Sequence, residues 1–327
     1  PARQVSIASG LSLDTGAITV NKVCSSGLQS VLIGNDMIQA GTANIVLAGG
    51  MESMTMSPYL MPNARQGYRM GSGEVIDHMF YDGLQNPYDQ NLMGYFAEQT
   101  SKQYGFTRED QDLFSIESVS RSLRAQKSGL FDDEIEPVVV KTRRDTTTIS
   151  KDEEPEKCDI DKIPSMRPAF DKNGTVTAAS SSSISDGAAS LIIMSADEAE
   201  SRGLEPLAII RGHKRHSQEP EWFTTANIGA IDKLHKKLDW NKDLVDLYEI
   251  NEAFACVTMA AMTDLDIDHN KLNIHGGACA LGHPIGASAA RILITLIYAL
   301  KANKGKRGIA SACNGGGEAV AIAIEIP

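Results

Sequence analysis

Two cysteines and one histidine of this chain lie in short segments that are rich in glycine and other small residues. These segments are residues 21–27 (NKVCSSG, with Cys24), 282–286 (GHPIG, with His283) and 313–317 (CNGGG, with Cys313). A thiolate is a strong nucleophile, an imidazole can take a thiol proton, and backbone N–H groups in tight turns can stabilise an oxyanion. The residue types therefore predict an acyl-transfer site, provided that the fold brings the three segments together.

Each of these residues also has an ordinary structural explanation. Cys24 precedes a predicted helix, whose N-terminus favours thiolate over thiol, but a small buried cysteine is a common alternative. His283 lies in a Gly-His-Pro triplet, which is weak evidence when taken alone. Glycines 315–317 fit a backbone packed against a ligand or a bend between strands. Asn251, at the start of residues 251–255 (NEAFA), fits a helix cap or a polar group that faces the site.

The composition is that of an ordinary globular protein, with 327 residues, 42% hydrophobic and 22% charged, and a net charge of −11. The negative charge argues against nucleic acid and anionic membrane surfaces as partners. Five cysteines without a CxxC pair or a Cys/His cluster predict neither a disulfide framework nor a metal site. The longest apolar run, residues 292–300, is too short to cross a bilayer. The chain opens at residues 1–4 (PARQ) as if inside a helix, so we expect that an N-terminal segment is missing.

The order of predicted elements is similar in two parts of the chain. Residues 1–54 read as helix, strand at 17–20, the Cys24 turn, a helix, and a strand at 44–48. In the C-terminal part, the His283 turn is followed by a buried helix at 286–302, a strand at 308–312 and three glycines. The repetition predicts two similar halves related by a pseudo-twofold axis, with parallel sheets covered by helices.

We predict an α/β fold with three parts. The N-terminal half comprises residues 1–54 and 177–204, a loop domain comprises residues 55–176, and the C-terminal half comprises residues 205–327. Within the loop domain a helix should begin at Thr107 with Asp110 as the partner in a capping box. The charged residues 143–157 are interpreted as a solvated loop.

Taken together, these segments resemble the thiolase family, and the resemblance covers essentially the whole chain. Residues 21–27 resemble the block around the thiolase nucleophile, and residues 49–54 (GGMESM) resemble the glycine–methionine block that follows it. The remaining three catalytic loops are matched by residues 251–255, 282–286 and 313–317. Five motifs in the right order make the resemblance specific. It implies the thiolase fold, with buried central helices and with the family's opening strands missing.

The resemblance also implies catalytic roles. Cys24 would be acylated, and His283 would deprotonate it and help to hold the thioester oxygen. Cys313 would remove or return the proton at the α-carbon of the second acyl group. Asn251 would position a water that forms one oxyanion hole with His283, and the backbone N–H groups of Cys24 and Gly315 would form the other.

Four further positions would bind the substrate. Ser182 falls where the family places a serine that contacts the pantetheine arm of coenzyme A, and the others are Leu92, Met93 and Phe254. Leu92 stands where short-chain thiolases usually carry histidine, so it bears on the recognition of CoA or of the acyl chain. The basic residues 213–216 (HKRH) could meet the CoA phosphates or form a solvated patch.

The reaction that the resemblance implies is the reversible Claisen condensation of acetyl-CoA to acetoacetyl-CoA through an acyl-cysteine. Coenzyme A is then a substrate or product; no tightly bound cofactor or metal is expected, and a monovalent cation is possible. A homodimer or homotetramer is expected. Residues 152–155 (DEEP) and 161–164 (DKIP) look like those of mitochondrial acetoacetyl-CoA thiolases, which suggests the mitochondrial matrix, with the cytoplasm as the alternative. The alternative functions are a thiolase with a different or branched acyl preference and a non-catalytic protein that binds CoA or lipid.

Overall fold

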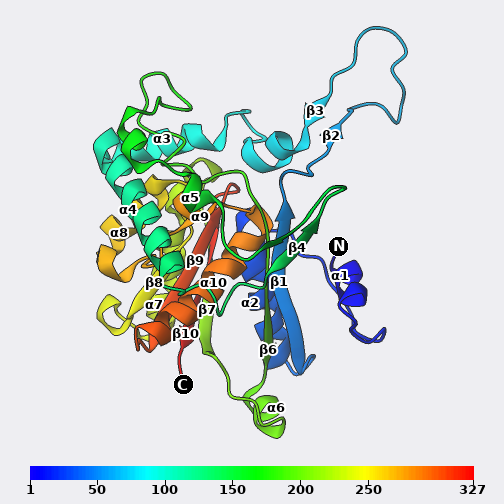
Figure 1. Ribbon diagram of the computed structural model, residues 1–327, viewed down its shortest axis with the longest axis vertical. Helices are drawn as coiled ribbons and strands as arrows, with labels where there is room; N and C mark the ends of the chain where they lie inside the picture. The colour runs from blue at the N-terminus through cyan, green and yellow to red at the C-terminus, as the bar shows by residue number, and fades with distance from the viewer.

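Two central helices lie against each other between two sheets in the computed structural model, which describes residues 1–327 (Figure 1). They are α2 (Ser26–Gln39) and α10 (Ile285–Ala302). By length and mean hydropathy α10 could cross a membrane, but 72% of it is buried inside the protein. Helices that are apolar on nearly every side belong in the core of a protein or in a membrane. The burial of α10 among α2 and the sheets confirms the prediction of a central helix.

The C-terminal sheet has the strand order β7 (Ile209–Ser217), β10 (Glu318–Glu325), β9 (Arg307–Asn314) and β8 (Leu247–Ile250). Only β8 and β9 are parallel; β10 is antiparallel to both of its neighbours. The prediction of parallel sheets is therefore largely wrong. A short connection joins only antiparallel strands, and the glycine turn after Cys313 is such a connection. The helices α7 (Ala226–Leu238) and α8 (Ala255–Leu265) complete this half.

The N-terminal sheet consists of β1 (Ile45–Ser53) and β6 (Asp186–Met194), which pair antiparallel. The predicted strand at residues 17–20 is wrong, because the segment is irregular and largely exposed, and Ile18 is 67% exposed. A β-prone sequence forms a strand only when its backbone groups find a partner strand, and none lies beside this segment. The predicted helix at the start is present as α1 (Ala2–Ala8).

The same unit of helix, strand and antiparallel strand occurs twice, as α2–β1–β6 and as α10–β9–β10. This repetition is the one that the sequence predicts. The two units differ in what joins their strands. Between β9 and β10 there is only a turn of glycines, whereas between β1 and β6 the chain runs through residues 54–185. Figure 1 shows much of this long segment at one end of the molecule, above the ends of the central helices.

The long segment contains two main helices, α3 (Met93–Tyr104) and α4 (Arg108–Lys127). Residues 143–157 are not simply a loop, since they contribute one strand of an exposed hairpin and a short helix. The remaining strands here are β2 (Tyr59–Leu60), β3 (Ile76–Asp77), β4 (Val138–Lys141) and β5 (Thr146–Ile149). The short helices of the whole chain are η1 (Val23–Ser25), η2 (Met79–Leu84), α5 (Glu154–Lys157), η3 (Ile160–Ser165), α6 (Ala196–Ser201), η4 (Pro220–Thr225), η5 (Lys242–Leu244), η6 (His269–Lys271) and α9 (Ala278–Leu281).

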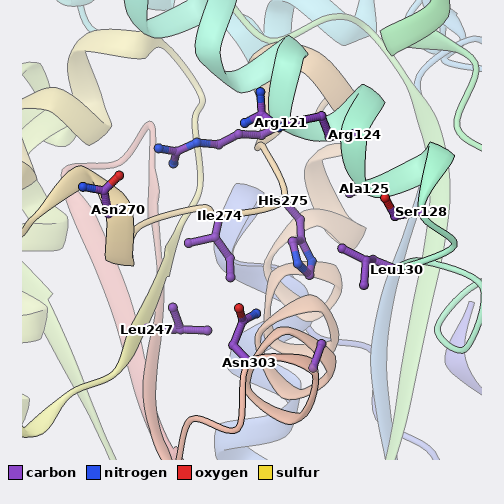
Figure 2. A pocket seen from close by; sticks show the side chains of 11 residues that line it. Arg121, Arg124, Ala125, Ser128, Leu130, Leu247, Asn270, Ile274, His275 and Asn303 are labelled. Atoms are coloured by element: carbon purple, nitrogen blue, oxygen red, sulfur yellow. The ribbon is translucent and has the colours of Figure 1, made fainter.

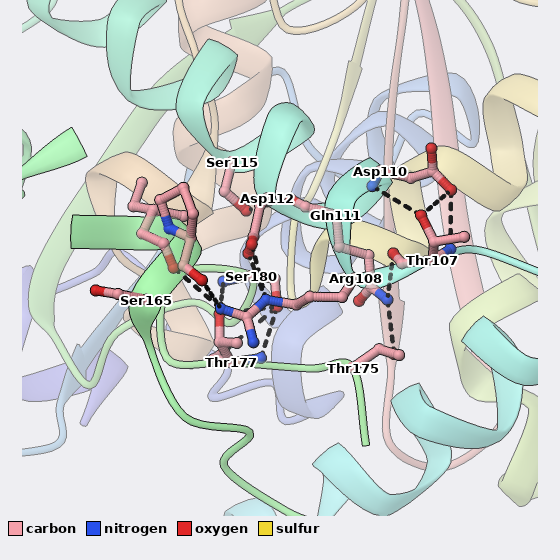
Figure 3. Close-up of polar contacts among 12 residues, drawn as sticks. Thr107, Arg108, Asp110, Gln111, Asp112, Ser115, Ser165, Thr175, Thr177 and Ser180 are labelled. Carbon is pink, nitrogen blue, oxygen red and sulfur yellow. Dashed lines mark hydrogen bonds and ion pairs between the residues drawn. The ribbon is translucent and has the colours of Figure 1, made fainter. Parts of the chain in front are cut away.

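Helix α4 begins with the predicted capping box. The Thr107 hydroxyl accepts from the Asp110 N–H at 3.1 Å, and the Asp110 carboxylate accepts from the Thr107 N–H at 2.8 Å (Figure 3). Two N–H groups at the start of the helix are thereby satisfied. The pKa of Asp110 is lowered, chiefly by the hydrogen bonds from Thr107, so the carboxylate is the form that caps the helix.

Polar side chains of α4 hold the segment that leads towards the serine run, residues 180–183 (SSSS). The Arg108 guanidinium contacts Asp112 at 2.8 Å and donates to the Ile163 carbonyl at 3.0 Å (Figure 3). Gln111 donates to the Thr175 hydroxyl at 2.8 Å. Arginine is suited to this role because its fork of donors can serve a carboxylate and a carbonyl at once. These contacts fix residues 160–177 against the helix.

The central helices and strand β1 approach one another at positions that have no side chain. A Cβ at Gly50 would overlap the Gly286 carbonyl oxygen, and a Cβ at Gly27 would lie 2.9 Å from Ala290. We expect Gly50→Ala to lower the free energy of unfolding by at least the ~1–3 kcal/mol typical of overpacking, measured by chemical denaturation. Gly83→Ala is the matched control, because a Cβ there meets its nearest neighbour at 3.5 Å. Equal stability of the two variants would contradict this account.

Candidate active site

The two cysteine loops meet at the start of α2, where Ser25 connects them. Its hydroxyl donates to the Ala312 carbonyl at 2.9 Å and accepts from the Asn314 side-chain amide at 3.2 Å. Ser25 is fully buried. Cys24 directly precedes Ser25 in the sequence, and Cys313 lies between Ala312 and Asn314. Both cysteines therefore flank this hydrogen-bonded contact. The two sulfurs are close enough for charge on Cys24 to raise the pKa of Cys313.

Backbone N–H groups face the Cys24 sulfur. They belong to Cys24 itself and to Gly315, the pair that the resemblance assigns to an oxyanion hole. A backbone N–H costs no side-chain entropy to position, so two of them in one place form a preorganised anion site. The geometry puts these donors beside the atom that would carry the acyl group.

His283 and Asn251 form a second pair. The His283 Nε2 atom lies 3.4 Å from Asn251 Nδ2, and both side chains are buried. Asn251 is not a helix cap, because the following helix α8 begins at Ala255. Instead its N–H donates to the Ser311 carbonyl, and its Oδ1 has no protein partner. A buried amide oxygen without a partner is a place for an ordered water.

The His283 loop reaches the cysteines through α10. The turn η1, which contains Cys24, packs against both α10 and β9. The Gly286 N–H donates to the Glu52 carboxylate at 3.1 Å, and the His283 N–H donates to the Ser183 carbonyl at 3.2 Å. The structure thus brings the three predicted loops together at the adjacent N-terminal ends of the central helices.

The Cys24 thiol is protonated at neutral pH. Burial raises its pKa to about 12, although the side chain keeps some access to solvent. Its own N–H and that of Gly315 lower the pKa, while the charge of Glu52 raises it. The expectation that the helix start favours the thiolate is therefore wrong for the resting protein, because desolvation outweighs the backbone donors.

His283 is the matching neutral base. Burial, and then the positive charge of Arg291, lower the pKa of His283 to about 4. The ring is consequently uncharged at neutral pH and can accept a proton. Burial likewise raises the pKa of Cys313 strongly, with a further increase from Cys24, so this second sulfur is also a thiol at rest.

Three of the four predicted substrate-binding residues lie close to these loops. A Cβ added at Gly315 would lie 2.9 Å from the Met93 sulfur, so Met93 lies against the Gly315 turn. Ser182 donates from both its N–H and its hydroxyl to the Ala253 carbonyl, which places it beside Phe254. Leu92 precedes α3 as its N-cap and is 36% exposed, so it lies nearer the surface than Met93.

Phe170 is a neighbour that the sequence did not single out. Its ring lies over Gly94, where a Cβ would overlap it, and it meets the Phe254 ring edge-on at 5.9 Å between centroids. A single phenylalanine in a loop carries no sequence signal, because only the folded chain places it beside Phe254.

Other residues considered from the sequence have structural partners. Cys256 is buried, and its thiol lies 3.6 Å from the Ala97 carbonyl. Two members of the basic cluster connect β7 to α2: His213 contacts Asp36 at 2.8 Å, and Arg215 donates to Gln29 at 2.9 Å. These contacts favour a structural explanation for the cluster.

An open hollow lies elsewhere, between α4, the end of α10 and the loop before α9 (Figure 2). Its volume is about 380 Å³. It is lined by side chains that include Arg121, Arg124, Asn270, His275 and Asn303. None of the predicted site residues lines it, so the hollow is separate from the cysteine loops.

The chain belongs to the thiolase family. The thiolase N-terminal domain matches residues 1–197, and the thiolase C-terminal domain matches residues 204–326. The fold and the recognition of the family from its motifs are thereby confirmed.

Proteins that are similar to this chain over almost its whole length carry acetyltransferase names. The acetyl-CoA acetyltransferase of Cupriavidus necator is 43% identical over 99% of this chain and 83% of its own length. The acetyl-CoA acetyltransferase of Saccharomyces cerevisiae is 45% identical over 99% of this chain and 83% of its own length. Among solved structures, Acat5 thiolase from Ascaris suum in complex with coenzyme A has a TM-score of 0.93 and 39% identity, over 100% of this chain and 83% of that one. The Bacillus anthracis acetyl-CoA acetyltransferase has a TM-score of 0.96 and 39% identity with the same coverage.

The protonation states lead to a pH prediction for the resting protein. Iodoacetamide should alkylate Cys24 with a rate that rises about tenfold per pH unit between about pH 7 and pH 10, because only the thiolate reacts and its fraction grows tenfold per unit below the pKa. Peptide mass spectrometry would assign the modification, and N-acetylcysteine is the control whose rate levels off near its own pKa. A rate that is constant over this range would indicate a preformed thiolate–imidazolium pair and contradict the neutral pair.

Proposed function

We propose that this chain is an acetyl-CoA C-acetyltransferase, which condenses two acetyl-CoA molecules to acetoacetyl-CoA and cleaves short 3-ketoacyl-CoA in reverse. The observation that carries the proposal is the position of the Cys24 sulfur, facing two backbone N–H groups and close to the second thiol, Cys313. The names of the similar proteins support the same reaction.

In the first half-reaction, Cys24 attacks the thioester carbon of acyl-CoA. The thiol has a high pKa and the neutral His283 a low one, so the proton leaves sulfur as the new S–C bond forms, rather than beforehand. The oxyanion accepts from the N–H groups of Cys24 and Gly315, and each such donor is worth about 3 kcal/mol in the transition state. The CoA thiolate leaves and takes the proton of the Cys313 thiol, so Cys313 becomes a thiolate and His283 stays protonated.

In the second half-reaction, Cys313 acts as the base at the α-carbon of acetyl-CoA. The Cys313 thiolate left by the first half-reaction removes a proton from the methyl group of acetyl-CoA, and the resulting carbanion attacks the acetyl group on Cys24. The bond between Cys24 and the acyl carbon breaks, and the Cys24 sulfur takes the proton of the His283 imidazolium. Burial raises the pKa of Cys313, which makes its thiolate a strong base suited to a weakly acidic C–H bond. The enolate oxygen is held by His283 and by a water on the free Oδ1 of Asn251.

Two alternatives have specific support. A different or branched acyl preference is favoured by Leu92, which replaces the usual histidine and is followed by Met93, in a neighbourhood that also contains Phe254 and Phe170. Comparing kcat/KM for acetoacetyl-CoA and its 2-methyl derivative would decide this point. A non-catalytic protein that binds CoA or lipid is disfavoured, because all four catalytic groups are retained in one place.

The activity itself is tested by thiolysis. The protein, incubated with acetoacetyl-CoA and CoA, should consume the enolate absorbance, and Cys24→Ala should lower the rate at least about 10³-fold, because the nucleophile is lost. Cys158→Ala is the matched control and should keep the rate, since Cys158 lies in another part of the chain. After acetyl-CoA, mass spectrometry should find an acetyl group on Cys24 and not on Cys158. Equal rates for wild type and Cys24→Ala would reject the mechanism, and no rate in either would favour the binding protein.

We further propose that the protein is a homodimer or homotetramer. The hairpin of β2 and β3 extends away from the body (Figure 1) and exposes large apolar side chains, with Met61 56% and Met70 98% accessible. Exposed apolar groups gathered on one arm favour a protein partner. Light scattering behind size exclusion should give at least twice the chain mass of 35.2 kDa. Met70→Asp should raise the dissociation constant if this arm is in the interface, and a monomeric wild type would contradict the proposal.

The mitochondrial matrix remains the proposed location, on the basis of residues 152–155 and 161–164. Cell fractionation with a matrix marker would test it, with the cytoplasm as the alternative outcome.

A monovalent cation is a candidate activator. Thiolysis rates in potassium chloride and in tetramethylammonium chloride would show whether one is used.

A further inference from the structure

The environment of the His283 ring defines where its proton lies. The Nδ1 atom is 2.5 Å from the Ser288 hydroxyl oxygen, and Nε2 is 3.4 Å from Asn251 Nδ2. Ser288 belongs to the first turn of α10 and is 0% exposed, while His283 is 6% exposed. Because bulk solvent has little access to the ring, these two neighbours decide which nitrogen carries hydrogen in the neutral form.

The Ser288 hydroxyl has a single hydrogen, and this hydrogen has a partner. The oxygen lies 2.9 Å from the Pro284 carbonyl, four residues earlier, which is the usual acceptor for a serine inside a helix. A hydroxyl that donates to a carbonyl must accept at its second contact. Nδ1 of His283 is therefore the donor to Ser288 and carries the hydrogen.

The contact on the other side of the ring selects the same form. Asn251 Nδ2 is an amide donor, so Nε2 is favourably placed only if it presents its lone pair. The opposite tautomer would set an Nε2–H against an amide N–H. It would also require the Ser288 hydroxyl to give up its hydrogen bond to the Pro284 carbonyl.

We propose that Ser288 is a positioning residue that keeps Nε2 of His283 unprotonated, so that it can accept the proton of Cys24. The proposal rests on the proposed function for the meaning of that proton transfer. When Cys24 reacts, its S–H bond breaks and an Nε2–H bond forms, so Nε2 gives up its contact with Asn251 Nδ2, while Nδ1–H continues to donate to Ser288. The positive charge on the ring strengthens this hydrogen bond, and the same Nε2–H is then available to a thioester oxygen.

The serine also ties the ring to the backbone of α10. Its acceptor, Pro284, is the residue that directly follows His283 and precedes the helix. The His283 ring, the Ser288 hydroxyl and the Pro284 carbonyl are thus joined by consecutive hydrogen bonds. Rotation of the imidazole would therefore break a buried hydrogen bond. Removing the hydroxyl leaves a buried Nδ1–H without a partner and releases both the orientation and the tautomer.

The test combines a spectroscopic and a kinetic measurement on the full chain. Protein labelled with ¹⁵N-histidine, with His283→Asn used for assignment, should show Nδ1 protonated and Nε2 unprotonated in the wild type near neutral pH. Ser288→Ala should lose this pattern and lower kcat/KM for thiolysis about 10–100-fold, the range found when the hydrogen-bond partner that orients a metal-ligating histidine is removed. Ser288→Thr keeps the hydroxyl and should restore both.

Thr295→Val is the matched control, since it removes another buried hydroxyl from α10, one that bonds Glu134 at 3.0 Å and not His283. It should leave the histidine signals unchanged. A wild type with hydrogen on Nε2, or a Ser288→Ala protein with unchanged signals and rate, would overturn the proposal. If Ser288→Ala does not fold, the wild-type spectrum alone decides. Absence of thiolysis in the wild type would reject the proposed function but not the tautomer, which is read from the spectrum.

Discussion

The contact between α2 and α10 is the constraint on which the site depends. At Gly27 of α2 a single methyl group would overlap Ala290 of α10, and at Gly50 of strand β1, which lies against both helices, it would overlap the Gly286 carbonyl of α10. This approach sets the helix that begins after Cys24 against the helix that begins after His283. Since each reactive residue lies just before its helix, fixing the two helices also fixes the two loops. The site is thus a consequence of core packing rather than of contacts between catalytic side chains.

Burial of the site has a chemical consequence. In water a thiol and an imidazole titrate within about two pH units of each other, whereas here burial moves the pKa of Cys24 up and that of His283 down. Both shifts favour uncharged groups, so the resting site holds no ion pair to compete with a substrate. In the proposed mechanism charge appears only as the thioester carbonyl is attacked, and the backbone N–H groups of Cys24 and Gly315 beside the Cys24 sulfur would donate to it. The low polarity that suppresses ionisation at rest strengthens those hydrogen bonds during the reaction.

The sequence predicts the features that depend on local pattern. The motifs around Cys24, His283 and Cys313, the buried helix at residues 286–302 and the capping box at Thr107 can be read from residue types and spacing. It fails where the outcome depends on distant parts of the chain. Residues 17–20 have β propensity but no partner strand, and the helix dipole at Cys24 is outweighed by surroundings that other segments supply. Phe170 could not be found at all, because its role arises only from its distance to Phe254.

The repeated helix–strand–strand unit explains how one site obtains two different kinds of group. In the C-terminal unit the strands β9 and β10 are joined by the glycine turn, so Cys313 and Gly315 stay close to the ends of the central helices. In the N-terminal unit the strands β1 and β6 are separated by residues 54–185, which bring Met93, Phe170 and the serine run to the same end. The short connection supplies rigid backbone and a thiol, which suit catalysis, and the long one supplies side chains that shape the surroundings of a substrate. A change in acyl preference can therefore arise in the inserted segment while the paired helices and their reactive loops stay the same.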